Sequence, residues 1–134
     1  SRGLGDVYKR QLYIPAAILT AILCFSLWTG RYVDSRVETW QQMLERADRA
    51  AGQEDWAQAE SRLREAARDW RKSAPFLHTL MEHDELDEAE TLLAGAMAAC
   101  QVRDQADFHK LLSQLRAQLD HLAETQALDL QNIL

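Results

Sequence analysis

Length, composition and charge exclude several classes of protein. The chain has 134 residues, of which 47% are hydrophobic and 27% are charged, so it can form one packed domain of ordinary size. Two prolines and five glycines are too few for a turn-rich β-sandwich or a glycine-looped nucleotide-binding fold. A net charge of −6 argues against binding to nucleic acid, and two cysteines cannot build a disulfide framework or a cysteine-rich zinc site.

The first residues of the chain are expected to be a leader that is foreign to the fold. Residues 1–11 contain no initiating Met and do not resemble the start of a natural domain. Lys9 and Arg10 precede an apolar segment, which favours a cytoplasmic N-terminus, although Arg31 and Arg36 follow that segment. We expect the part of the chain after the apolar segment to lie outside the cytoplasm.

Residues 12–30 are expected to form a transmembrane helix. These 19 positions carry no charge. As a helix they would span roughly 28 Å, close to the thickness of the hydrocarbon core of a bilayer. Pro15 is expected in the first turn of this helix, where its missing N–H breaks no hydrogen bond. The alternative is a cleaved signal peptide, but Ser26-Leu27-Trp28 matches a small-x-small cleavage site poorly. We therefore expect an uncleaved signal-anchor in the cell membrane.

Residues 31–134 have the periodicity of a helical bundle. They carry 12 Lys and Arg against 20 Asp and Glu, and their apolar residues recur at spacings of three and four. The predicted fold is all-α: the transmembrane helix followed by an antiparallel bundle of about four helices. An array of helix hairpins is the alternative, because residues 55–60 align with residues 85–90. The recurring apolar residues form four stripes, one for each predicted helix of the bundle: Val33, Val37, Trp40, Leu44 and Ala47; Trp56, Ala59, Leu63, Ala66 and Trp70; Leu86, Ala89, Leu93, Met97 and Cys100; and Phe108, Leu112, Leu115, Leu119 and Leu122.

The breaks between the predicted helices carry residues that favour helix ends. Gly52 is expected to end the first bundle helix in a left-handed conformation. Asp55 with Gln58 resembles a capping box for the second helix. Ser73 and Pro75 are expected to mark the start of the third.

The fourth helix is expected to begin at a cap on Asp104 and to end near Ala127. Four apolar residues then remain at the C-terminus: Leu128, Leu130, Ile133 and Leu134. They would either fold back as an end cap of the bundle or form a docking tail for a partner.

The densest polar stretch is residues 82–90, which contains His83, and His78 lies five residues before that histidine. A metal site is not expected there, because two histidines five residues apart on one helix point about 140° apart. The acidic residues are better suited to the N-terminal end of a helix dipole. The chain also lacks a serine–histidine–aspartate signature, a reactive-cysteine motif and a phosphate-binding loop, so neither enzyme activity nor a cofactor is expected.

Three pieces of the sequence carry a likeness to a known family. They are residues 25–28 (FSLW), residues 80–90 (LMEHDELDEAE) and residues 128–134 (LDLQNIL). On these pieces, residues 12–134 resemble the bacterial domain-of-unknown-function family 4363, short membrane-anchored helical proteins of clostridia and related Firmicutes. The resemblance implies a membrane helix with a helical remainder, and it implies no activity.

The sequence therefore predicts a single-pass membrane protein that acts through contacts rather than catalysis. The expected partners are the lipid bilayer and another protein, such as a multi-pass protein of the same membrane. The alternative function is a ligand-sensing extracytoplasmic bundle with a small pocket between its helices. The candidate interaction residues are Glu82, His83, Asp84, Glu85, Asp87, Glu88, Leu128, Leu130, Ile133 and Leu134.

Overall fold

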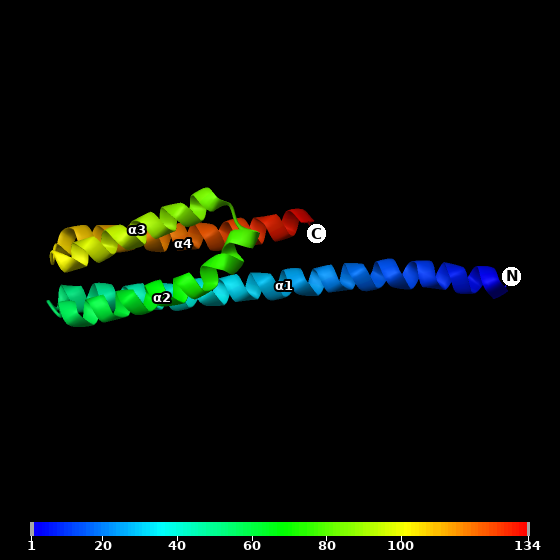
Figure 1. Ribbon diagram of the computed structural model, residues 1–134, viewed down its shortest axis with the longest axis horizontal. Helices are drawn as coiled ribbons and strands as arrows, with labels where there is room; N and C mark the ends of the chain where they lie inside the picture. Colours follow the sequence, from blue (N-terminus) through cyan, green and yellow to red (C-terminus); the bar gives the residue numbers. More distant parts are fainter. Residues whose placement is uncertain (1, 134) are drawn as a thin grey trace.

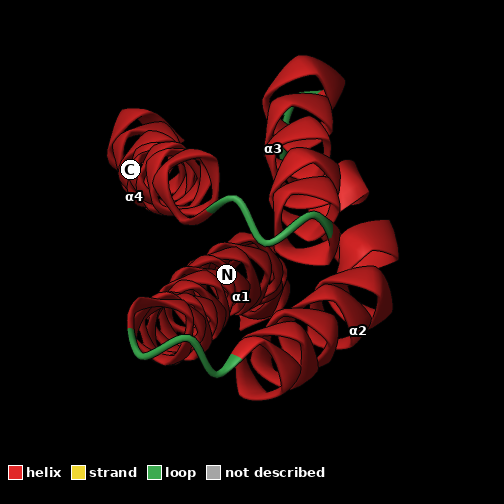
Figure 2. Ribbon diagram, turned by 90° about the vertical axis from the view of Figure 1, so that its left-hand side faces the viewer, coloured by secondary structure: helices red, strands yellow, loops and turns green. Residues whose placement is uncertain are grey.

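The computed structural model describes the backbone of residues 2–133 and the side chains of residues 10–129 and 132. The described residues form four α-helices and no strand: α1 (Arg2–Gly52), α2 (Trp56–Leu80), α3 (His83–Gln101) and α4 (Gln105–Ile133). Consecutive helices run antiparallel, and α4 packs back against α1, so the four helices form a closed ring (Figures 1 and 2). The all-α antiparallel bundle predicted from the periodicity is confirmed.

Helix α1 is twice as long as the bundle requires. Its N-terminal half projects beyond the other helices, and no break separates the projecting half from the half inside the bundle (Figure 1). The boundary expected at residue 30 therefore coincides with no structural interruption. Pro15 lies inside the helix rather than in its first turn, because α1 already begins at Arg2.

The projecting half presents large apolar side chains outward. The residues concerned are Leu12, Tyr13, Ile14, Ile18, Leu19, Ile22, Leu23, Phe25, Leu27 and Trp28. Among the described residues, one helix is long and apolar enough to cross a membrane, and only 11% of its apolar window is buried. Such a helix is consistent with a signal anchor or with a signal sequence.

The predicted apolar stripes meet in one continuous core. All four helices contribute, and the residues without measurable exposure include Ala47, Leu63, Leu86 and Phe108. The expected burial of the tryptophans is confirmed for Trp40 and Trp70, whose ring centroids lie 5.1 Å apart. Trp56 is half-buried, with its ring centroid 5.7 Å from that of Phe108. Cys100 is a buried core residue, as expected.

The turn between α1 and α2 differs from the prediction at Gly52. Gly52 is still helical, and Glu54 takes the left-handed conformation instead, with φ 63°. The turn closes where the Asp55 amide donates to the Ala50 carbonyl at 2.8 Å. The expected cap is present, because the Asp55 carboxylate accepts a hydrogen bond from the Gln58 amide at 3.2 Å.

The expected helix start at Ser73 and Pro75 is wrong. Both residues lie inside α2, which continues to Leu80. Contacts with α1 hold this segment helical: the Ser73 and Tyr32 hydroxyls lie 3.2 Å apart, and the rings of Phe76 and Tyr32 pack edge to face. Since proline removes one backbone hydrogen bond and crowds the preceding turn, it bends a helix. Figure 1 shows α2 bending toward α3 over its last turns.

Polar contacts fix how α1 sits against its two neighbours. Asp69 on α2 accepts hydrogen bonds from Arg36 Nη1 at 3.0 and 3.2 Å and from Trp40 Nε1 at 2.7 Å. On the α4 side, Asp48 lies 2.8 Å from His109 Nδ1. These groups connect α1 to both neighbours across the edges of the apolar core.

The start of α4 agrees with the prediction and its end does not. The Asp104 carboxylate accepts a hydrogen bond from the Asp107 amide at 3.2 Å. At the other end α4 continues past Ala127 to Ile133. Gln126 is only 7% exposed, and the backbone of α4 then continues along the bundle axis instead of folding back (Figure 1).

Candidate functional site

The acidic stretch forms the beginning of α3. Glu82 occupies the N-cap position and is followed in the first turn by Asp84 and Glu85. As expected, these negative charges complement the positive end of the helix dipole. Glu85 makes polar contacts with α4. Its carboxylate lies 3.1 Å from His121 Nε2, and its backbone carbonyl accepts a hydrogen bond from Gln118 Nε2 at 3.0 Å.

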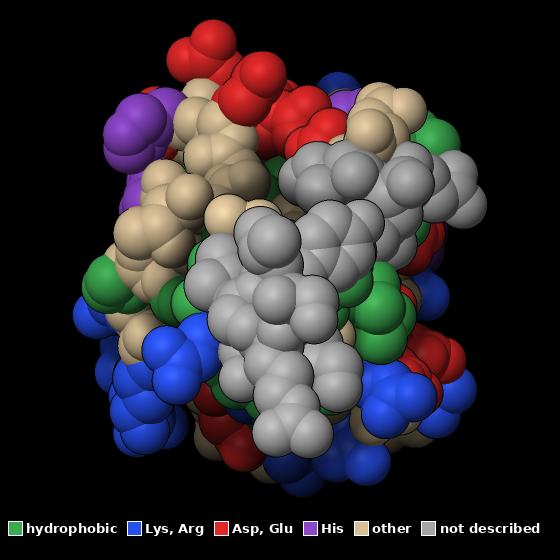
Figure 3. All heavy atoms as spheres, turned by 90° about the vertical axis from the view of Figure 1, so that its right-hand side faces the viewer, with side chains coloured by type: hydrophobic (Ala, Val, Ile, Leu, Met, Phe, Trp, Pro, Cys, Tyr) green, Lys and Arg blue, Asp and Glu red, His purple; other side chains and the backbone are tan. Residues whose placement is uncertain are grey.

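The other predicted residues of this stretch are solvent-exposed: Glu82, His83, Asp84, Asp87 and Glu88. Figure 3, which looks at the end from which α1 projects, shows acidic side chains gathered along one edge. Lys and Arg side chains gather toward the opposite edge. The acidic stretch is therefore accessible to a partner.

The expectation that His78 and His83 lie on one helix is wrong. His78 lies in α2 and His83 begins α3, so they are not on one helix. The turn between the helices brings their Nδ1 atoms to 2.9 Å and their ring centroids to 4.7 Å. The nearest carboxylate, that of Glu90, lies 3.9 Å from His78 Nε2. Among the described residues, no group of three or more His, Cys, Asp and Glu is placed to hold a metal ion.

The structure describes only part of the predicted C-terminal tail. Leu128 is 59% exposed on α4. The side chains of Leu130 and Ile133, and all of Leu134, lie outside the described residues. The tail remains a predicted contact site.

A groove between α2 and α3 was missed by the sequence analysis. Two adjoining hollows of about 380 and 480 Å³ share Arg71 and Met97. The lining is mostly apolar and includes Trp70 from α2 and the half-buried Leu93 from α3, together with the carboxylate of Glu90. The rim on the α2 side carries Arg64, Arg68 and Arg71.

The arginines of this rim follow helical spacing. They lie at i, i+4 and i+7, which places them on one face of α2. Arg64 pairs with Glu60 at 2.6 Å. Arg68 and Arg71 form no ion pair with any side chain that the structure describes. The spacing was readable from the sequence, but the groove also requires α3, which only the tertiary structure brings alongside.

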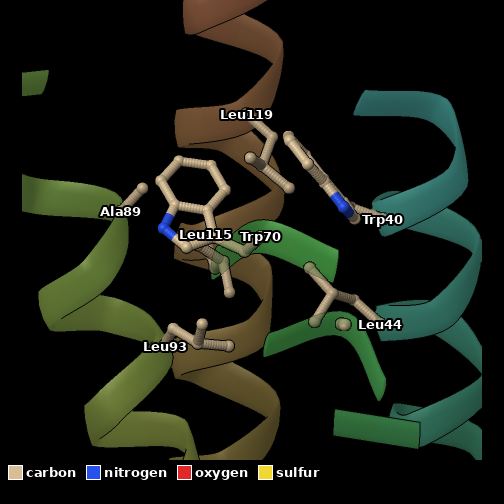
Figure 4. A pocket seen from close by; sticks show the side chains of 8 residues that line it. Trp40, Leu44, Trp70, Ala89, Leu93, Leu115 and Leu119 are labelled. Atoms are coloured by element: carbon tan, nitrogen blue, oxygen red, sulfur yellow. The ribbon is translucent and has the colours of Figure 1, made fainter. Parts of the chain in front are cut away.

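Beneath the groove lies a small cavity in the core. Figure 4 shows Trp40 and Trp70 converging on it with Leu93, Leu115 and Leu119. Its volume of about 20 Å³ is close to that of one water-sized probe. This cavity is therefore too small for a metabolite.

The two cysteines differ in environment. Burial, reinforced by Glu60, raises the pKa of the Cys100 thiol. Since the thiolate is the nucleophile, this shift makes Cys100 a poor reactive residue. Cys24 lies exposed on the projecting half of α1.

A third hollow lies where α1 leaves the bundle. It has a volume of about 490 Å³ and is bounded by α1, α2 and the end of α4. Its lining combines apolar side chains such as Ile22 and Phe25 with the polar Thr29, Gln126 and Asp129.

Together these features define an all-α protein whose antiparallel four-helix bundle carries a long, apolar and mostly exposed N-terminal helix. The chain belongs to DUF4363, a domain of unknown function, whose family model matches residues 27–133. The resemblance predicted from the sequence is confirmed, although the match begins inside the first of the three pieces. No curated protein and no solved structure matches the chain.

Proposed function

We propose that the protein is a single-pass membrane protein whose bundle lies outside the cytoplasm and binds another protein, as an accessory subunit of a membrane complex. The observation that carries the binding role is the groove between α2 and α3. It combines a mostly apolar lining with the arginine rim on a chain whose net charge is −6.

The projecting half of α1 supports the anchor. Most of its large apolar side chains are more than half exposed, which is costly in water and favourable in hydrocarbon. All backbone groups of a helix are satisfied internally, so this segment can enter a bilayer without further partners. Because α1 is continuous, the anchor would hold the bundle in a fixed orientation to the membrane surface.

The groove suits one kind of occupant. Its two walls are the antiparallel helices α2 and α3, and an amphipathic helix can lay its apolar face on Trp70, Leu93 and Met97. Arg68 and Arg71 would then face carboxylates on the flank of that helix. The partner is therefore expected to present an acidic amphipathic segment. The acidic start of α3 and the exposed Leu128, neither of which lines the groove, are proposed as separate contact sites.

The alternative role as a ligand sensor has less support. A pocket for a small ligand usually has a volume of about 300 Å³ or more, and the cavity in the core has only about 20 Å³. A sensed ligand would therefore need the hollow of about 490 Å³ where α1 leaves the bundle.

Capture from native membranes with chemical crosslinking tests the binding role. The triple variant Arg64→Glu, Arg68→Glu, Arg71→Glu should lose the crosslinked partner, because three attractive contacts become repulsive. The matched control is Arg46→Glu, Arg103→Glu, Lys110→Glu, which changes the charge equally at exposed positions outside the groove and should keep the partner. Recovery of the unaltered chain only as a free monomer would refute the proposal.

Carbonate extraction tests the anchor separately. The full chain should stay in the membrane pellet, since a helix in hydrocarbon is not held by charge. Deletion of residues 12–25 should release the chain into the soluble fraction.

A further inference from the structure

Polar and apolar side chains exchange places at the end of the bundle from which α1 projects, here called the base. Among the described residues, the buried polar side chains all lie at or next to the base: Ser26, Thr29, Ser73 and Gln126. Three of them border the hollow between α1, α2 and the end of α4, and the fourth lies against Tyr32. Trp28 and Leu128 are instead exposed, at 56% and 59%. This arrangement is unfavourable in water, whereas in a bilayer apolar side chains face lipid and polar ones lie between helices.

The base also carries a cluster of aromatic rings from two helices. The Trp28 ring centroid lies 5.8 Å from that of Tyr32 and 6.0 Å from that of Phe76 on α2. Phe25 extends the cluster at 6.2 Å from Trp28 and is 54% exposed. Tryptophan and tyrosine are enriched where the hydrocarbon of a bilayer meets the headgroups. Because Phe76 belongs to the cluster, the boundary that these rings indicate includes the end of α2 as well as α1.

The length of the apolar segment of α1 indicates the same boundary. Residues 12–30 would span roughly 28 Å, about the thickness of the hydrocarbon core. The part from Ile22 to Thr29 borders the hollow together with the ends of α2 and α4, and Figure 1 shows the last turns of α4 beside it. Without that part, residues 12–21 would span only about 15 Å. Since Lys9 and Arg10 precede the segment, lengthening it on that side would take charges into hydrocarbon. A bilayer of ordinary thickness therefore reaches the ends of α2 and α4.

The exposed charges near the base limit how deep it lies. Arg31 directly follows the apolar segment, and Asp129 lies on the last turns of α4; both are exposed. Charged side chains are costly in hydrocarbon but are solvated among lipid headgroups. The base therefore fits the boundary between headgroups and acyl chains, where apolar faces lie about 5–10 Å deep, rather than the bilayer centre.

We propose that the base of the bundle is immersed in the lipid interface, so that lipid contacts Trp28 of α1, Phe76 of α2 and Leu128 of α4. The membrane then holds the ends of α2 and α4 as well as the anchor, and the contact proposed for Leu128 is with lipid. The inference rests on the proposed anchoring of α1 in the bilayer.

Quenching of tryptophan fluorescence by brominated lipids tests the immersion. The full chain, in a Trp28→Phe background, is reconstituted into phosphatidylcholine vesicles with bromine near the carbonyl end of the acyl chains. Leu128→Trp places a new fluorophore on α4 at an exposed position. The fluorescence that it adds should fall by about half or more, because apolar residues at a membrane surface reach the boundary between headgroups and acyl chains. Ala127→Trp, at the neighbouring exposed position, repeats the measurement if Leu128→Trp fails to fold.

Two matched variants in the same background give the limits of the measurement. Leu19 is 68% exposed on the projecting half of α1, and Leu19→Trp should be quenched by bromine placed deeper in the acyl chains. Val102 is 75% exposed at the opposite end of the bundle, and Val102→Trp should not be quenched by either lipid.

Two results would overturn the proposal. Quenching of Leu128→Trp by aqueous iodide but not by brominated lipid would place the base in water. Quenching by neither would mean that protein, such as a second copy of the chain, covers the base. Leu19→Trp distinguishes this failure from that of the proposed function. If Leu19→Trp is quenched and Leu128→Trp is not, only the immersion is contradicted, whereas lipid quenching at neither position contradicts the anchor as well.

Discussion

Asp69 links α1 to α2, and its removal should be among the costliest single changes at the edge of the core. Its carboxylate accepts three hydrogen bonds, two from Arg36 and one from Trp40 Nε1. Trp40 is only 3% exposed, so Asp69→Ala leaves a buried donor unpaired, at a cost of about 1–3 kcal/mol. Arg36 is about one-third exposed and can be rehydrated, so loss of the ion pair adds at most about 1 kcal/mol.

These magnitudes predict an order of stability among three variants. Asp69→Ala should lose about 2–3 kcal/mol, because both effects apply. Asp69→Asn keeps an acceptor for Trp40 and should lose about 1 kcal/mol, similar to Arg36→Ala. For a bundle of about 100 residues, the largest loss corresponds to a fall in Tm of roughly 8–15 °C.

Thermal unfolding of the full chain in detergent micelles, followed by tryptophan fluorescence, measures this order. Trp40 donates the hydrogen bond and packs on Trp70, so two of the four tryptophans that give the signal lie at or near the site. Asp34→Ala is the control, since it removes an exposed carboxylate from the same helix. A loss below about 0.5 kcal/mol for Asp69→Ala, within the range of ordinary surface changes, would refute the reasoning.

Four further predictions concern the core, the two cysteines and the tail. Leu63→Ala should lower the free energy of unfolding by about 2–5 kcal/mol in chemical denaturation, because the side chain is fully buried; an unchanged midpoint would contradict the core assignment. Cys100 should react with a maleimide at pH 8 far more slowly than a free thiol, because its raised pKa lowers the thiolate fraction, and denaturant should restore the rate. Cys24 should be protected from a charged maleimide in intact membranes although the bundle leaves it exposed, and labelling there would argue against the anchor. Leu128→Ser should leave Tm unchanged because the side chain is 59% exposed, whereas a clear drop would place Leu128 in a packed end cap.

The sequence alone determined the helical class, the apolar stripes and the segment that leaves the bundle. These features depend on local rules: a period of three to four residues buries one face of a helix, and a carboxylate before a helix caps its free amides. The caps at Asp55 and Asp104 were predicted correctly for this reason. The same local rules failed at Pro75, where packing against α1 carries α2 through the proline.

Only the tertiary structure decided which residues from different helices meet. It brought His78 against His83 across a turn, placed the half-buried Leu93 of α3 beside the arginine face of α2, and buried the Thr29 hydroxyl without a partner. Arg64, Arg68 and Arg71 could be grouped from their spacing, but the groove they border could not. The physical reason is that spacing fixes the face of a helix on which a side chain lies, whereas the facing helix and its register are set by packing of the whole bundle.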